Sequence, residues 1–113
     1  MPRPKKCRKV CCMPRTTEFN PATCYDKVVF MTVDEYETIR LIDKEGFSQE
    51  ECGAYMHVAR TTVQQIYNNA RKKLAEVIVD GCKLKIEGGD YQICSGEENV
   101  CKCGGCEKHR CQL

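Results

Sequence analysis

The sequence predicts a mainly α protein with three helices, the last two in a helix-turn-helix arrangement, together with a short extended strand and cysteine-rich ends. Three observations support this fold class. Apolar residues recur at helical spacing through the middle of the chain, capping signals mark the helix starts, and most of the 11 cysteines lie toward the two ends. A length of 113 residues limits the chain to one small domain with a modest core.

The first helix is predicted from about Val33 to Glu45. Thr32 and Glu35 have the spacing of a capping box, and acidic residues fill the first turn, where the helix dipole favours negative charge. Gly46 follows the last helical residue and supplies a stop.

A shorter helix is predicted from Ser48 to Met56, because Ser48 and Glu51 form a second capping box. Cys52 lies on its apolar face, where we expect it to act as a small hydrophobic core residue.

The third helix is predicted from Arg60 to Ile78 and has the clearest pattern in the chain. This stretch contains neither glycine nor proline, and its apolar residues are three or four positions apart. They are Val63, Ile66, Tyr67, Ala70, Leu74, Val77 and Ile78.

The polar face of the third helix carries side chains of the types that contact DNA. In a helix-turn-helix, the second helix enters the major groove, where Arg and Gln can bind base edges with two hydrogen bonds. No acidic residue occurs between Glu51 and Glu76. The expected base-reading residues are Arg60, Thr61, Thr62, Gln64 and Gln65, and the expected phosphate contacts are Asn68, Arg71 and Lys72. The alternative is a helical scaffold whose polar face is merely solvated.

Residues 1–15 contain six basic residues and no acidic residue. We expect Lys5, Lys6 and Arg8 to follow the minor groove or the phosphates, and the alternative is an arm without order in the absence of a partner. The domain boundaries that follow are a basic, cysteine-containing arm at 1–26, a helix-turn-helix domain with a short strand at 27–91, and a cysteine-rich tail at 92–113.

The stretch "KLKIEGGDYQI" after the third helix alternates in polarity and predicts a short strand. One strand needs a partner, which is either "KVVFM" at residues 27–31 or a second subunit. A homodimer is expected, because a two-fold axis would match a palindromic DNA site.

The tail sequence "CKCGGC" has cysteine spacing suited to a metal ion. Zinc and an iron–sulfur cluster fit equally well, and thiol redox chemistry or an unstructured extension are the alternatives. The expected ligands are Cys101, Cys103, Cys106 and Cys111, with Cys94 or His109 as substitutes and Cys7, Cys11 and Cys12 of the arm as further candidates. The arm thiols could instead be reactive groups among lysines.

Four blocks of the sequence resemble a family of small, uncharacterised bacterial and archaeal proteins considered to bind DNA. The blocks are "RPKKCRKVCCMPRTTEFNP", "TVDEYETIRLID" followed after Lys44 by "EGFSQEECGAYM", "ARKKLAEVIVDG" and "LKIEGGDY". The resemblance covers residues 2–91. It implies a domain similar to region four of bacterial sigma factors, of the winged-helix-type superfamily, with a role in transcription and no reaction.

Carried onto this chain, the resemblance places the DNA-reading helix at Arg60 to Ile78 and leaves contact with RNA polymerase open. The turn departs from the family pattern of glycine, aliphatic residue and serine, because His57, Val58 and Ala59 stand there. Ala59 cannot cap the helix through its side chain, a loss of about 1 kcal/mol relative to serine.

The sequence therefore predicts a DNA-binding transcriptional regulator whose tail binds zinc or an iron–sulfur cluster. The alternative is a metal-carrying or thiol-redox protein on the same scaffold without a DNA-binding role. An enzyme is not expected, because the chain lacks a phosphate-binding glycine loop and a nucleophile with a positioned base. No apolar run has the length of a membrane span or a signal peptide, so we expect a cytoplasmic protein.

Overall fold

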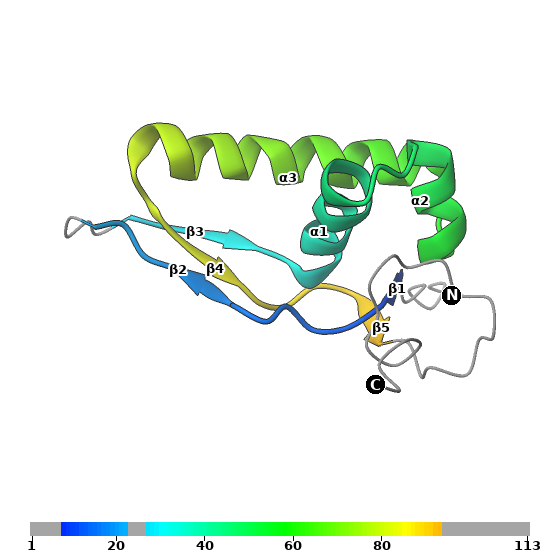
Figure 1. The fold of residues 1–113 in the computed structure, drawn as a ribbon, viewed down its shortest axis with the longest axis horizontal. Helices are drawn as coiled ribbons and strands as arrows, with labels where there is room; N and C mark the ends of the chain where they lie inside the picture. The colour runs from blue at the N-terminus through cyan, green and yellow to red at the C-terminus, as the bar shows by residue number, and fades with distance from the viewer. Residues whose placement is uncertain (1–7, 23–26, 94–113) are drawn as a thin grey trace, which may run out of the picture.

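A layer of helices lies over a layer of short strands in the computed structural model, which describes residues 8–22 and 27–93 (Figure 1). The strands are β1 (Arg8–Val10), β2 (Glu18–Phe19), β3 (Val28–Met31), β4 (Lys83–Ile86) and β5 (Tyr91–Ile93). The helices are α1 (Val33–Thr38), the π-helix η1 (Ile39–Lys44), α2 (Gln49–Met56) and α3 (Arg60–Asp80).

The strands form two small sheets. In the three-stranded sheet, β4 lies between β2, which is antiparallel to it, and β3, which is parallel to it. In the two-stranded sheet, β1 and β5 are parallel, with Val10 opposite Ile93. The pairing of residues 27–31 with the segment after the third helix, expected from the sequence, is confirmed by the β3–β4 register.

Parallel strands need a long crossover connection, and here the helices supply it. The chain leaves β3, runs through α1, η1, α2 and α3, and returns to β4 beside β3. Side chains alternate along both strands, so that Val29, Met31, Leu84 and Ile86 are buried beneath α3.

The helix starts agree with the predicted capping signals. Both capping boxes are present, Thr32 with Glu35 and Ser48 with Glu51. The first helix, however, continues past Thr38 as a π-helix, in which the Glu45 amide donates to the carbonyl of Arg40 five residues earlier.

A tight connection joins α2 to α3. His57 has φ 63° and ends α2 in the left-handed conformation, and the Val58 amide donates to the Gly53 carbonyl at 3.0 Å. Ala59 precedes α3 in extended conformation and makes no side-chain cap, as the sequence predicts. A Cβ at Gly53 would lie 2.8 Å from the Val58 carbonyl oxygen, so this glycine allows α2 to pack close to the connection.

Two apolar clusters form the core. One lies between α3 and the sheets and includes Val10, Met31 and Leu84. The other joins α2 to α3 and includes Cys11, Cys52 and Val63. Cys52 is fully buried with its thiol 3.7 Å from the sulfur of Met56, which confirms the prediction that it is a core residue.

The predicted fold class, a mainly α three-helix helix-turn-helix of the winged-helix type, is wrong. The described residues form a mixed α/β structure with two sheets, and β1 and β2 lie within residues 1–26, the predicted arm. Strands of two to four residues carry too few positions for a periodic pattern, so charge and proline dominated the sequence signal there. Within the described ranges, none of the helices has the length and apolarity to cross a membrane.

Candidate nucleic-acid interface

The outer face of α3 is a polar surface of the helical layer. Val63, Ile66 and Ala70 point into the core, so the opposite face of the same helix points away from the protein (Figure 1). Exposed side chains on α3 include Arg60, Thr61, Gln64, Gln65, Asn68, Arg71 and Lys72, and Thr62 is half-buried. All eight residues that the sequence predicted to contact DNA on this helix therefore lie at or beside one surface.

The cations of α3 differ in their surroundings. Arg60 and Lys72 have no carboxylate within ion-pair distance among the described residues, which leaves them available to phosphate. Arg71 lies 3.8 Å from Asp43 and over the ring of Tyr67, yet it remains 62% exposed. Lys73 donates to Glu35 at 2.7 Å and holds α3 against α1. Three of the four cations between Glu51 and Glu76 are thus positioned to meet a ligand.

Tyr67 connects the outer face of α3 to η1. Its hydroxyl donates to Asp43 at 2.7 Å. Burial raises the pKa of the Tyr67 phenol, and the hydrogen bond to Asp43 and its negative charge raise it further. The phenol is therefore protonated near neutral pH and acts as a donor that fixes η1 beside Arg71.

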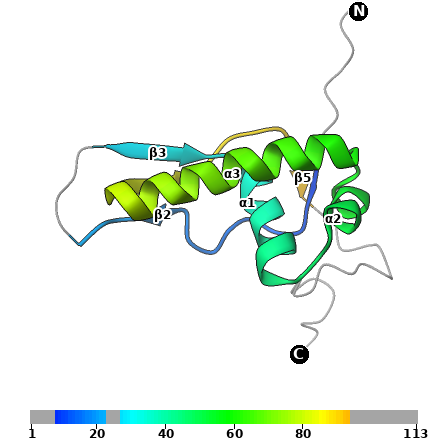
Figure 2. The same ribbon diagram turned by 90° about the horizontal axis from the view of Figure 1, so that it is seen from above.

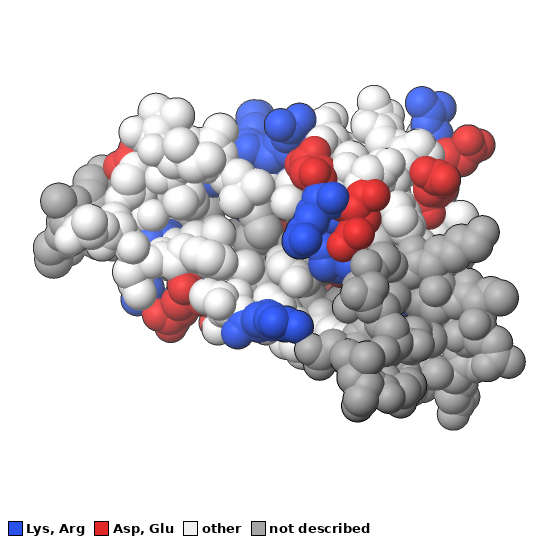
Figure 3. Space-filling view, viewed as in Figure 1, with Lys and Arg blue, Asp and Glu red and all other residues white. Residues whose placement is uncertain are grey.

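Basic and acidic side chains are mixed on one face of the molecule. Figure 3 shows lysine and arginine atoms interspersed with aspartate and glutamate atoms, without one broad basic patch on that face. The part of α3 formed by residues 60–75 includes no acidic side chain. Such a surface favours local contact with a nucleic acid over long-range attraction.

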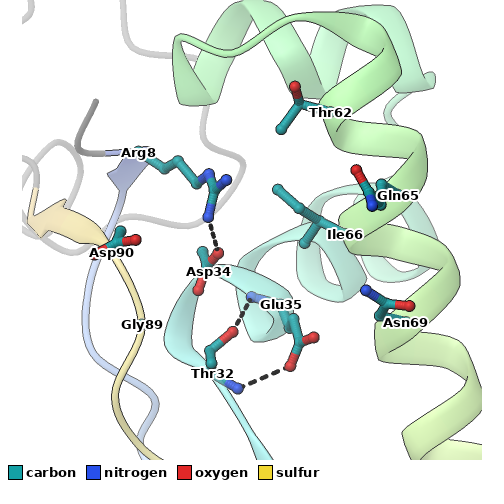
Figure 4. Close-up of a pocket in the computed structure, with 10 residues that line it drawn as sticks. All are labelled: Arg8, Thr32, Asp34, Glu35, Thr62, Gln65, Ile66, Asn69, Gly89 and Asp90. Carbon is teal, nitrogen blue, oxygen red and sulfur yellow. Dashed lines mark hydrogen bonds and ion pairs between the residues drawn. The ribbon is translucent and has the colours of Figure 1, made fainter. Parts of the chain in front are cut away.

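A cavity of about 380 Å³ lies along one flank of α3 (Figure 4). Thr62, Gln65, Ile66 and Asn69 line it from the helix. The other lining residues are Arg8, Thr32, Asp34, Glu35, Gly89 and Asp90, from β1, the start of α1 and the β4–β5 connection. Two predicted base readers, Thr62 and Gln65, therefore also border this cavity.

Arg8 belongs to the wall of that cavity rather than to a free arm. Its Nη1 donates to Oδ2 of Asp34 at 2.7 Å, and the Asp34 side chain is only 5% exposed. The other Asp34 oxygen, Oδ1, has no hydrogen-bond partner in the described part of the chain. The role of Arg8 in DNA binding stays a prediction, and Lys5 and Lys6 lie outside the described residues.

A buried ion pair that sequence analysis missed holds the segment after β1 against the helices. Glu37 is fully buried and accepts two hydrogen bonds from Arg40, both at 2.9 Å. Its Oε2 also accepts the Cys11 amide at 3.0 Å. Burial alone would lower the pKa of Arg40, but the hydrogen bonds and charge of Glu37 raise it above its ordinary value. The signal in the sequence was the spacing of Glu37 and Arg40, which are three residues apart on one helix face.

The expected metal ligands fall mostly outside the described residues. This is the case for Cys7, Cys94, Cys101, Cys103, Cys106, His109 and Cys111. Within residues 8–22 and 27–93, no group of three or more His, Cys, Asp or Glu side chains could hold a metal ion. Cys11 and Cys12 are described, and their sulfur atoms lie 3.7 Å apart. Burial raises the pKa of Cys52 to about 12, so this thiol is unsuited to metal binding or redox chemistry near neutral pH.

These features define a small α/β protein in which one long helix presents a polar face that is free of acidic residues from residue 60 to residue 75. The chain belongs to the family described as "Protein of unknown function DUF134", whose model matches residues 1–94. The matched residues include all of β1–β5 and α1–α3.

Relatives share most of their length with this chain. A UPF0251 protein of Desulfitobacterium hafniense (strain Y51) is 59% identical over 113 residues, covering 97% of this chain and 90% of the relative. A UPF0251 protein of Thermoanaerobacter sp. (strain X514) is 44% identical, covering 87% and 89%. One of Ruminiclostridium cellulolyticum is 38% identical, covering 96% and 90%. No solved structure matches the chain.

Proposed function

We propose that the protein is a sequence-specific DNA-binding protein that acts in the regulation of transcription. The observation that carries this proposal is the outer face of α3, where arginine, glutamine, asparagine and threonine side chains are exposed and residues 60–75 include no acidic residue. The resemblance of the α2 and α3 segments to region four of sigma factors supports the same proposal.

The first turns of α3 read the bases. Arg60, Thr61 and Gln64 are exposed, and an α-helix of this kind fits the width of the major groove. One good pair of hydrogen bonds from Arg or Gln to a base edge contributes about 1–3 kcal/mol of discrimination. Lys72, two turns from Gln64, contacts phosphate and contributes affinity without sequence preference.

Selection of DNA from a random-sequence library by the full-length protein tests this proposal. We expect the wild type to enrich one short motif, and Gln64→Ala to lose preference at one or two positions of it. Lys72→Ala should weaken binding to all sequences and reduce the slope of log affinity against log salt by about 1.

A matched control is available on the opposite layer. Lys85 lies in β4 on the sheet face that points away from α3, where its ammonium pairs with Glu18 at 3.8 Å. Lys85→Ala should leave both affinity and motif unchanged. Failure of the wild type to enrich any motif would contradict the proposal, as would a motif that Gln64→Ala does not alter.

A second part of the proposal concerns metal. The separation of 3.7 Å between the sulfur atoms of Cys11 and Cys12 is close to that of two thiolates on one tetrahedral zinc or iron ion, roughly 3.8 Å for metal–sulfur bonds of about 2.3 Å. Because β1 and β5 are parallel, Val10 lies opposite Ile93, and Cys94 is the next residue in the sequence. We propose that Cys11 and Cys12 join cysteines of residues 94–113 in binding zinc or an iron–sulfur cluster.

Iron, zinc and acid-labile sulfide per chain, measured on protein purified without oxygen, test the metal proposal. Bound metal that falls in Cys11→Ser, Cys12→Ser and Cys103→Ser variants but not in Cys82→Ser would support it. Metal content near zero in the wild type would contradict it. A protein that binds metal but enriches no DNA motif would fit the alternative function of a metal-carrying or thiol-redox protein.

RNA polymerase and a second copy of the chain are further proposed partners. The first rests on the sigma resemblance alone, and binding of purified polymerase to the full-length protein tests it. The proposal of a second copy is supported by the arrangement of the strands.

A further inference from the structure

The strand β3 lies at an edge of the three-stranded sheet, and no described element pairs with its outer side. Figure 2 shows β3 along one margin of the molecule, beside α3. An unpaired strand edge presents a row of backbone donors and acceptors that can pair with another chain.

The hydrogen bonds to β4 determine which backbone groups of β3 remain unused. The amide of Lys83 donates to the Lys27 carbonyl at 3.0 Å, and the amide of Glu87 donates to the Met31 carbonyl at 2.9 Å. Residues 27, 29 and 31 therefore direct their backbone groups toward β4. By the alternation of a strand, the amides and carbonyls of Val28 and Phe30 point outward.

The apolar side chains of Val28 and Phe30 are also left partly exposed to solvent. Val29 and Met31 are buried beneath α3, whereas Phe30 is 52% exposed and Val28 is half-buried on the other face of the sheet. Phe30 is one of few large apolar side chains that the described chain exposes to this extent. The Lys27 ammonium next to the start of β3 is paired with Glu76. Its charge therefore does not keep a second strand from pairing there.

We propose that the outer edge of β3 is a homodimer interface, in which the β3 strands of two copies pair antiparallel into one continuous sheet of six strands. The edge is self-complementary. When Val29 lies opposite its own copy, Val28 of one chain faces Phe30 of the other, and both residues have outward backbone groups. That register forms about four main-chain hydrogen bonds and places each Phe30 beside the partner's Val28 on the same sheet face.

The symmetry of this pairing suits DNA recognition, and this step rests on the proposed function. A two-fold axis perpendicular to the sheet keeps both α3 helices on one side, with their outer faces pointing in the same direction. Because α3 runs alongside β3 (Figures 1 and 2), the two amino-terminal ends lie at opposite ends of the dimer. The axis between the paired strands would relate the two α3 helices as a two-fold axis relates the half-sites of a palindromic DNA.

Sedimentation equilibrium of the reduced, full-length chain without DNA tests the interface. The short strands predict a weak dimer, so the protein concentration should range from about 10 μM to about 1 mM. Val28→Pro removes an outward amide and leaves the bonds to β4 intact, and Phe30→Lys places a charge on each copy. Each variant should raise the dissociation constant at least about tenfold, and Phe30→Lys decides the matter if Val28→Pro fails to fold.

Ile78→Ser is the matched control, because Ile78 is 78% exposed on α3 and lies outside β3. Its dimer should dissociate as the wild type does. A wild type that stays monomeric at every concentration would overturn the interface, and so would a dimer that Phe30→Lys leaves intact or that Ile78→Ser dissociates. Because no DNA is present, this result is independent of whether α3 reads bases, and a monomer could still bind a half-site.

Discussion

Glu37→Gln is the substitution whose effect on stability the structure predicts most sharply. The Glu37 carboxylate is fully buried, and the Arg40 side chain that it binds is 14% exposed. The variant keeps the shape of the side chain but removes its charge. The glutamine side chain has one acceptor oxygen and one NH₂ group that can only donate. Because Arg40 and the backbone N–H of Cys11 are also donors, at least one of the three existing hydrogen bonds is lost.

The expected loss is about 3 kcal/mol. Removing one partner from a buried ion pair costs about 3–5 kcal/mol, because the other charge is left desolvated, and the partial exposure of Arg40 places this pair at the low end. The free energy of unfolding of a small domain is about 5–15 kcal/mol, so such a loss is a large fraction of the total.

Urea unfolding followed by circular dichroism measures this loss. Glu45→Gln is a matched control, because the Glu45 carboxylate lies 3.8 Å from the same guanidinium but is 22% exposed, and its removal should cost less than about 1 kcal/mol. Equal losses in the two variants, or a loss below about 1 kcal/mol in Glu37→Gln, would refute the assignment of Glu37 as the anchor of the segment after β1.

Three further effects follow from local geometry. Ala59→Ser should raise the free energy of unfolding by about 1 kcal/mol in the same urea assay, because Ala59 stands at an uncapped helix start in extended conformation; no gain would mean that the serine cannot reach the α3 amides. Gly53→Ala should lower it by about 1 kcal/mol, since the close contact with the Val58 carbonyl outweighs the gain in helix propensity; a stabilised variant would argue against that contact. Iodoacetamide at pH 8 should label Cys52 in the native protein far more slowly than Cys12, which is partly exposed, because the Cys52 pKa is raised to about 12; equal rates in peptide mass spectra would contradict its burial.

The helices could be predicted from the sequence because their signals are local. The capping boxes at Thr32 and Ser48 each depend on two residues three positions apart, and the α3 pattern repeats over 21 residues. The change to a π-helix after Thr38 has no such paired signal, although Leu41, which is fully buried, lies off the stripe formed by Tyr36, Ile39 and Ile42.

The sheets could not be predicted in full because their pairing is distant in sequence. Arg8 pairs with Tyr91, and the basic composition around β1 resembles that of a solvated arm. The sequence also gives no sign of the ion pairs of Arg8 with Asp34 and of Lys73 with Glu35, since each pair joins residues on different elements. The sequence shows how many lysine and arginine residues the protein has. Only the fold shows that Arg8 and Lys73 form stabilising ion pairs, whereas Arg60 and Lys72 are exposed on α3.

The most direct test of the central claim is the NMR response of side-chain amides to a DNA duplex selected by the protein. The account predicts that the side-chain amide signals of Gln64, Gln65 and Asn68 shift on binding, because these groups lie on the exposed face of α3 that we propose to read DNA. Those of Gln92 in β5 and Asn20 after β2, which are also exposed, should keep their positions. Shifts at Gln92 and Asn20 with none on α3 would contradict the account and place the DNA on the strand layer.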